Sequence, residues 1–200
     1  MNRNLFPVTI FKTQIVPTEQ EYADFDQLLS KSFSTTNDGV WALESGKSTG
    51  EHDLFLHHEP AAKWLIDATM EHVVQFWKTL DYRREANIRI TSAWANLHKY
   101  GQSTGEHSHY GGAIRAHISA VYYFKKPKQS GNIEFVDPLE YIRKMEPIHQ
   151  YDETGKAMYQ EVDADQFDLV LFPSWLNHRT QMSLSTEDRV AVSINFLGLY

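Results

Sequence analysis

Residues 189–196 read Arg-Val-Ala-Val-Ser-Ile-Asn-Phe, an alternation of large apolar side chains with polar or small ones. A period of two is typical of a β-strand, because successive side chains of a strand point to opposite faces of its sheet. Arg189, Ser193 and Asn195 then share one face, and the large apolar residues share the other. This stretch predicts a strand with one apolar face and one polar face.

The same period of two extends over the C-terminal half of the chain, from about residue 86. Further strands are predicted there, separated by turn signals, at residues 88–97, 117–124, 132–136 and 167–172. The N-terminal part differs: residues 5–16 alternate weakly and indicate an opening strand, whereas the stretches that follow have apolar residues at helical spacing. A capping box at Thr18–Glu21 predicts a helix near 18–32, and Pro60 predicts the start of a second one.

Helices followed by many short strands predict an α+β, mainly β fold. The leading candidate is a double-stranded β-helix, a cupin-like jelly roll with the N-terminal helices packed on its sheet. The chain has 200 residues, of which 42% are hydrophobic, and we expect one domain spanning 1–200. Residues 1–86 would form strand and helical support, and residues 87–200 the jelly-roll core. The polar segment 137–165 is too long for a plain turn, and such insertions often cover sites.

Composition excludes several kinds of partner and site. Nineteen basic against 26 acidic residues give a net charge of −7, so no nucleic-acid partner is expected. The absence of cysteine leaves histidine and carboxylates as metal ligands. No apolar stretch approaches membrane-spanning length, and polar residues interrupt the N-terminus, so we expect a cytoplasmic protein without a membrane partner. Exposed sheet edges favour a homodimer.

Three histidines have the spacing of a metal site. His107 and His109 lie at i and i+2, which places both imidazoles on one face of a strand, although such a pair also occurs in polar loops. His178 follows an apolar strand far along the chain and could supply the third ligand. Arg189 has a planar fork that pairs with carboxylates. Alternatively, Arg189 is a surface residue paired with Asp188.

Several blocks of the sequence resemble, in the same order, those of a bacterial and phage family of 2-oxoglutarate- and Fe(II)-dependent oxygenases. The blocks are His107–His109, Ser119–Tyr123, Ser130–Pro138, Leu171–His178 and Arg189–Phe196, together with Leu5–Pro7 and Ser92–Asn96. The resemblance thus covers nearly the whole chain. It implies a dioxygenase that hydroxylates a substrate, with release of succinate and CO2, and that uses Fe(II) and 2-oxoglutarate. The sequence does not identify this substrate, and a small molecule, a peptide or an amino-acid side chain on a protein all stay open.

The resemblance also implies roles for individual residues. His107, His109 and His178 would be the iron ligands, and Arg189 would bind the C5 carboxylate of 2-oxoglutarate with help from Tyr123. Weaker candidates for the same pocket are Asn96, Ser193 and Asn195. No acid or base is assigned.

Several alternatives stay open. The wider superfamily usually has a carboxylate where His109 stands, so Glu106 could contribute one instead. Arg115 could replace Arg189, and His117 could line the pocket. Other histidines are expected to be solvent-facing or locally bonded: His52, His57, His58, His72, His98 and His149. The aromatic residues Trp94, Trp175 and Tyr122 could wall the substrate cavity or pack in the core. Two other functions remain: a cupin-like three-histidine metalloenzyme without 2-oxoglutarate, and a jelly-roll binding protein without turnover.

Overall fold

The computed structural model describes residues 7–35, 46–49, 55–111, 114–143 and 158–200. The described helices lie in the first half of the chain, except for the short helix α5. They are α1 (Glu19–Thr35), α3 (Phe55–His58), the 3-10 turn η1 (Pro60–Ala62), α4 (Lys63–Thr79) and α5 (Glu140–Arg143). The predicted capping box begins α1, since the backbone N–H of Thr18 donates to Glu21 Oε2 at 2.8 Å and that of Glu21 donates to Thr18 Oγ1 at 3.3 Å.

The strands form two antiparallel sheets and a small hairpin. The larger sheet has the order β1 (Phe11–Gln14), β9 (Asp168–Pro173), β6 (Ile118–Lys125), β11 (Arg189–Leu199), β3 (Asn87–His98) and β2 (Lys47–Ser48). The smaller sheet has the order β10 (His178–Thr180), β7 (Ile133–Val136) and β8 (Tyr159–Val162), and the hairpin pairs β4 (Tyr110–Gly111) with β5 (Ile114–Arg115). This mainly antiparallel arrangement confirms the predicted fold class.

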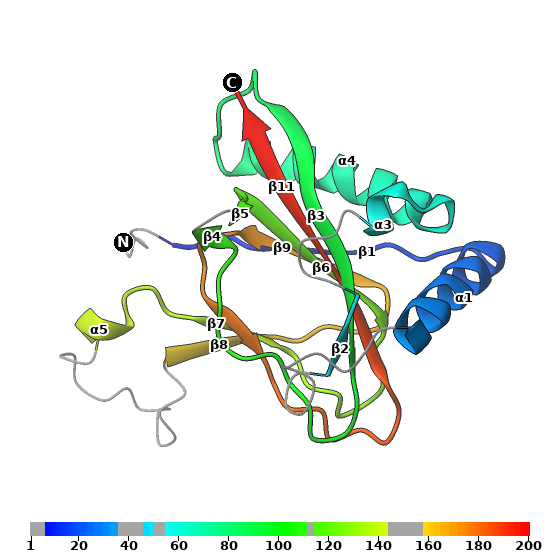
Figure 1. Ribbon diagram of the computed structural model, residues 1–200. Coiled ribbons are helices and arrows are strands. Elements are labelled where there is room, and N and C mark those ends of the chain that lie inside the picture. The colour runs from blue at the N-terminus through cyan, green and yellow to red at the C-terminus, as the bar shows by residue number, and fades with distance from the viewer. Residues whose placement is uncertain (1–6, 36–45, 50–54, 112–113, 144–157) are drawn as a thin grey trace.

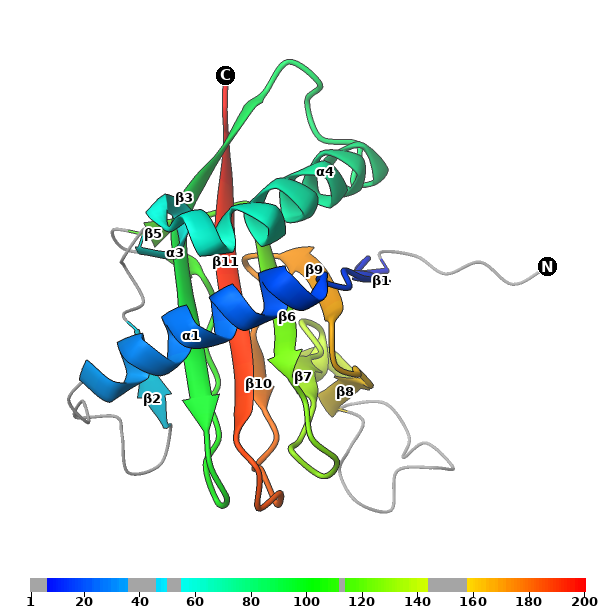
Figure 2. The same ribbon diagram turned by 90° about the vertical axis from the view of Figure 1, so that its right-hand side faces the viewer.

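The large sheet has helices on one face and the small sheet on the other. Figure 2 shows α1 and α4 lying across the same face of the sheet, over β3, β11 and β6. In Figure 1 the strands β7 and β8 lie on the side of β11 that faces away from these helices. The chain therefore forms three layers, with helices outside the large sheet and a second interior between the two sheets.

The alternation of the sequence divides the core in the same way. One apolar cluster joins α1 and α4 to the large sheet and includes Phe25, Phe76, Val192, Ile194 and Phe196. A second cluster lies between the two sheets and consists mainly of Tyr123, Ile133, Phe135, Val170, Phe172 and Ala191. The predicted strand 189–196 thus has its apolar face against the helices and its polar face inside the jelly roll.

Some sequence predictions are corrected in extent. The opening strand is shorter than residues 5–16, since β1 spans Phe11–Gln14; residues 1–6 lie outside the described part. The segment 137–165 is not one insertion, because it contains α5 and β8, a strand of the small sheet. Residues 144–157 lie outside the described residues, so its predicted covering role is not tested. None of the described helices is long and apolar enough to cross a membrane.

Candidate metal and co-substrate site

The three predicted histidines meet between the two sheets. Each of His107, His109 and His178 offers a ring nitrogen, and these three atoms lie within 4.8 Å of one another. His107 and His178 are an antiparallel bridge pair, with N–H···O distances of 3.0 Å and 2.9 Å in the two directions. His109 is fixed from its backbone, whose N–H donates to Ser174 O at 2.9 Å. Backbone pairing therefore brings together ligands that are about 70 residues apart in the chain.

Hydrogen bonds orient two of the three imidazoles. His107 Nδ1 lies 2.8 Å from the carbonyl oxygen of Gly105, and His178 Nδ1 lies 3.0 Å from that of Leu176. A carbonyl can only accept, so both Nδ1 atoms carry the hydrogen and the lone pair is on Nε2. Ligating histidines are commonly fixed in this way by a bond to the other ring nitrogen.

Burial keeps two of the ligands neutral. Desolvation, followed by the neighbouring His107, lowers the pKa of His109 to about 3. The same two causes, with His109 as a further one, hold the pKa of His178 well below its ordinary value. A metal ion binds neutral imidazole, so neither ring has to lose a proton near neutral pH before it can bind.

Aromatic rings enclose the histidine cluster on its inner side. The centroid of the Phe172 ring lies 4.7 Å from that of His178, and the Trp94 ring lies edge-on to His109 at 5.5 Å. Trp94 is only 4% exposed. Trp94 is therefore buried beside the histidine cluster.

Arg189 is a buried cation that has no anionic partner among the residues the structure describes. It begins β11 on the inner face and is 1% exposed, and no described carboxylate forms a salt bridge with it. Its Nη1 donates to the carbonyls of Ser130 at 2.8 Å and Gly131 at 3.1 Å, and its Nη2 lies 2.9 Å from Nδ1 of His98. Burying a charge without a counter-charge is costly, so the arrangement suits an anionic ligand.

Arg189 and Tyr123 each have a buried polar atom with no hydrogen-bond partner among the described residues, namely Arg189 Nε and the Tyr123 hydroxyl oxygen. Burial raises the pKa of Tyr123 to about 12, against the opposing effect of Arg189. The backbone of Ile133 is near this hydroxyl, but no hydrogen bond of normal geometry joins them. Both atoms are donors at neutral pH, so they could bind one carboxylate.

The other predicted pocket residues fall on the same inner face. Asn96 is half-buried and Ser193 is 9% exposed; in the sheet register they lie opposite Ala191 and Trp94 respectively. The amide of Asn195, by contrast, is engaged in the protein, because it donates to Ser92 Oγ at 3.0 Å and accepts from Ser119 Oγ at 2.7 Å. Asn195 thus has a structural network of its own.

Three alternatives from the sequence are not supported by the geometry. Glu106 is exposed and faces Tyr159 and Asn177, with oxygens at 3.5 Å and 3.4 Å from their polar atoms, and it is not part of the histidine cluster. Arg115 is exposed on β5. His117 accepts a bond from the N–H of Gly198 at 3.2 Å and contacts Trp77, a residue of the helix-facing core.

Of the two alternatives for Tyr122, the structure supports core packing, because this residue lies on the other face of β6. Its ring is fully buried in the helix-facing core, and its hydroxyl donates to the carbonyl of Ile15 at 2.9 Å. Burial raises the pKa of this hydroxyl. Trp175 is 44% exposed and so is a surface residue in this structure.

His98 is the residue that sequence reasoning missed. It was expected to be solvent-facing or locally bonded, yet it is 2% exposed and lies directly opposite Arg189 on the neighbouring strand. Its position at the end of the predicted strand 88–97 carried no sign of this contact. Only the register of β3 against β11 brings the two side chains together.

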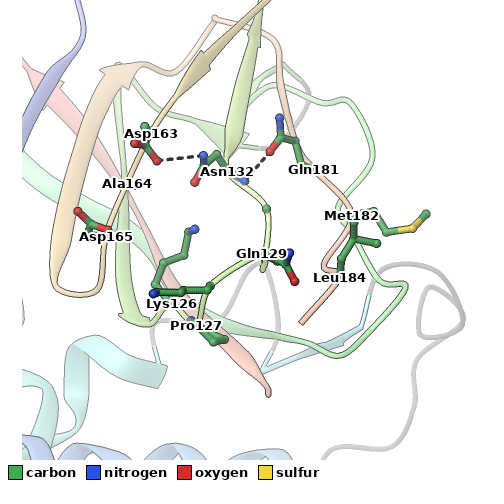
Figure 3. A pocket seen from close by; sticks show the side chains of 12 residues that line it. Lys126, Pro127, Gln129, Asn132, Asp163, Ala164, Asp165, Gln181, Met182 and Leu184 are labelled. Carbon is green, nitrogen blue, oxygen red and sulfur yellow. Dashed lines mark hydrogen bonds between the residues drawn. The ribbon is translucent and has the colours of Figure 1, made fainter. Parts of the chain in front are cut away.

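A cavity of about 410 Å³ adjoins the loop that Arg189 holds. Figure 3 shows its lining, with the side chain of Lys126 directed toward Asn132, whose amide is bonded to Asp163. Gly131 also lines the cavity. Burial, followed by the nearby Arg189, lowers the pKa of Lys126. The loop 130–132 therefore separates this outer cavity from the arginine inside.

The residues present fit both groups that the sequence resemblance implies. Three imidazoles with converging nitrogens are suitable ligands for a first-row divalent ion such as Fe(II). The Nε of Arg189 and the Tyr123 hydroxyl, which have no hydrogen-bond partner within the described ranges, fit a carboxylate. Together, these groups can hold a metal ion and an anionic ligand in one interior.

Comparison with known proteins gives a family and a fold. The model of a family described as "Putative 2OG-Fe(II) oxygenase" matches residues 92–195, more than half of the chain. A search of curated sequences found no significant match.

Several solved structures are similar to this chain. The prolyl-4-hydroxylase of Pseudomonas putida has a TM-score of 0.61 and 12% identity, over 94% of this chain and 92% of that one. The α-ketoglutarate-dependent epimerase SnoN of nogalamycin biosynthesis has a TM-score of 0.64 and 13% identity, over 95% and 78%. HygX of Streptomyces hygroscopicus, solved with nickel and 2-oxoglutarate bound, has a TM-score of 0.55 and 14% identity, over 94% and 82%. At these identities the likeness is one of fold.

Proposed function

Because the chain belongs to the 2-oxoglutarate- and Fe(II)-dependent oxygenase family, we propose that it is a dioxygenase that hydroxylates a small-molecule or peptide substrate, with release of succinate and CO2. In this proposal His107, His109 and His178 hold Fe(II), and Arg189 with Tyr123 binds the distal carboxylate of 2-oxoglutarate. The observation that carries it is the buried Arg189, which forms no ion pair with any described carboxylate and lies on the same inner face as the histidine cluster.

Charge balance supports the pairing of these two sites. Three neutral imidazoles leave the metal's two positive charges uncompensated, and Arg189 adds a third in the same interior. A 2-oxoglutarate dianion would offset most of this charge, with one carboxylate at each end. Bound Fe(II) would supply the activation of dioxygen, which no amino-acid side chain can perform.

The strand register supports a ligand that extends between the two ends. On β11 the residue after Arg189 on the inner face is Ala191, flanked by Asn96 on β3 and Tyr123 on β6. Next comes Ser193 beside Trp94, whose ring contacts the ligand histidine His109. A small alanine between the charged end and the metal end leaves room for the methylene groups of the keto acid, and Asn96 and Ser193 offer polar contacts beside it.

The protein's own contribution is to orient the reactants and limit water. Arg189 and Tyr123 would fix one end of the keto acid, which lowers the entropic cost of placing the other end. Phe172 and Trp94 contact His178 and His109, and these apolar rings would limit the access of water to that side of the site. The cupin-like alternative without 2-oxoglutarate gives Arg189 no ligand to bind.

The proposal is tested by turnover without a known substrate. Fe(II)-loaded protein is mixed with 2-oxoglutarate and oxygen, and succinate and CO2 are quantified against protein without metal. We expect slow formation of both products. Their amounts should be equal, because each 2-oxoglutarate that is oxidised gives one CO2 and one succinate. Bound Fe(II) and bound 2-oxoglutarate without any succinate would contradict the proposed reaction.

A further inference from the structure

His98 and Arg189 form a hydrogen bond on the inner face of the large sheet. His98 ends β3 directly opposite Arg189, and its Nδ1 lies 2.9 Å from Arg189 Nη2. A guanidinium has only donors, so Nδ1 must be the acceptor. A neutral imidazole whose Nδ1 is unprotonated carries its hydrogen on Nε2, and in His98 this atom lies 3.0 Å from Thr104 Oγ1. The contact therefore fixes one tautomer of His98.

The bonded chain continues from Thr104 toward the metal ligands. The backbone N–H of Thr104 donates to Thr180 Oγ1 at 2.7 Å, and that of Thr180 donates to the carbonyl of Thr104 at 3.0 Å. Thr180 shares a face of β10 with His178, two residues before it, and Thr104 precedes His107 by three residues. Hydrogen bonds thus connect the arginine, through His98, to both segments that carry the histidine cluster.

The donors of Arg189 show what His98 controls. A guanidinium has five N–H groups. The two carbonyls of the 130–131 loop use Nη1, and His98 uses one hydrogen of Nη2. Nε and one hydrogen of Nη2 remain for a ligand, and the Nε atom is buried without a partner among the described residues. The two carbonyls and His98 together leave the Nε–Nη2 edge of the guanidinium available, and His98 is the side chain that contributes to this arrangement.

We propose that His98 is a positioning residue, which holds the Nε–Nη2 edge of Arg189 toward the distal carboxylate and so makes the site selective for a dicarboxylate keto acid over a monocarboxylate one. This inference rests on the proposed function. It assigns to His98 no contact with the ligand itself: the histidine acts only through the arginine.

The test compares two keto acids that differ at one end. Fe(II)-loaded protein is titrated anaerobically with 2-oxoglutarate and with 2-oxobutyrate, which lacks the distal carboxylate. The selectivity ratio is the dissociation constant of 2-oxobutyrate divided by that of 2-oxoglutarate. His98→Leu is expected to weaken 2-oxoglutarate binding about tenfold, the size of one hydrogen bond to a charged group, while 2-oxobutyrate changes less than about twofold. A general loss of structure would weaken both.

A conservative variant and a control separate positioning from packing. In His98→Asn the side-chain oxygen can take the place of Nδ1 and accept from Arg189, so most of the selectivity should return. His117→Leu removes a histidine that contacts Gly198 and Trp77 on the helix side, and the ratio should stay at the wild-type value. Thr104→Val removes the acceptor of the His98 Nε2 hydrogen and should reduce the ratio about threefold, which keeps the test available if His98→Leu fails to fold.

The outcomes distinguish this inference from the proposed function. If the wild type binds both keto acids equally, the proposed function fails and the role of His98 fails with it. If the wild type discriminates, and His98→Leu and Thr104→Val discriminate equally well, only the role of His98 is wrong. Equal weakening of both keto acids in His98→Leu, with no recovery in His98→Asn, also overturns it.

Discussion

The two faces of the six-stranded sheet have different roles, although the side chains of both faces alternate along the same strands. On β11 the outward side chains Val192, Ile194 and Phe196 pack against the helices, and no polar group interrupts them. The inward side chains include Arg189, Ser193 and Asn195, buried polar groups that need partners. Substitutions on the outer face should therefore affect the free energy of unfolding, and substitutions on the inner face should affect ligand binding.

The largest expected effect on binding comes from a metal ligand. His178→Ala removes one of three converging nitrogens. Loss of a group that merely hydrogen-bonds a metal ligand can lower metal affinity by up to about 100-fold, so loss of the ligand itself should lower the affinity for Fe(II) by more than that. Anaerobic calorimetry measures it. His117→Ala is the matched control and should bind metal as the wild type does. Retention of tight binding in His178→Ala would place the metal elsewhere.

The largest expected effect on stability comes from the outer face. Ile194 is fully buried against the helices, and Ile194→Ala should lower the free energy of unfolding by about 2–5 kcal/mol. Denaturant unfolding of the metal-free protein measures this change. In folded Ile194→Ala protein, the dissociation constants of metal and 2-oxoglutarate should be unchanged. A selective loss of 2-oxoglutarate binding would show that the two faces are not separable.

An intermediate effect is expected at the charged end of the inner face. Arg189→Met keeps much of the side-chain volume but removes the donors, so 2-oxoglutarate binding should weaken by about 2–3 kcal/mol, and Fe(II) binding should stay within about twofold of the wild type. Paired titrations with metal and then keto acid measure both. Unchanged affinity for 2-oxoglutarate would refute the carboxylate assignment.

The smallest effect is expected one residue from Ile194. Ser193→Ala removes a hydroxyl from the inner face beside Trp94 and creates little cavity, so the free energy of unfolding should change by less than about 1 kcal/mol. Because Ser193 offers a polar contact beside the proposed keto-acid site, the dissociation constant of 2-oxoglutarate should rise by about threefold in this variant. Ile194→Ala is compared by the same two assays. If Ser193→Ala lowered the free energy of unfolding as much as Ile194→Ala does, the proposed difference between the two faces would be contradicted.

The strands were predictable because they depend on local patterns, whereas the place of His178 beside His107 and His109 depends on pairing between distant segments. The alternation of residues 189–196 assigned the inner face correctly. The i, i+2 spacing of His107 and His109 predicted that their imidazoles could meet, but the predicted strand is not formed there: His107 forms an isolated bridge, and both residues lie between β3 and β4. Tyr122 and Tyr123 show the limit of this reasoning: two adjacent tyrosines lie on opposite faces of β6, and only the parity of the strand distinguishes them. The structure places Tyr123 inside, as expected, and Tyr122 against the helices.

What the sequence could not predict depends on pairing between distant strands. His98 looks like any histidine at the end of a strand, and its contact with Arg189 follows from the register of β3 against β11. Likewise, the loop carbonyls that occupy Arg189 Nη1 come from Ser130 and Gly131, about 60 residues earlier. No local signal in the sequence specifies either contact.

The central claim is that the histidine cluster and Arg189 form one site for Fe(II) and 2-oxoglutarate. Its most direct test adds 2-oxoglutarate to anaerobic Fe(II)-loaded protein and records the visible spectrum. The claim predicts a metal-to-ligand charge-transfer band that is saturable in wild-type protein, absent in His178→Ala and shifted to higher 2-oxoglutarate concentration in Arg189→Met. Tight Fe(II) binding without any such band in the wild type would contradict it.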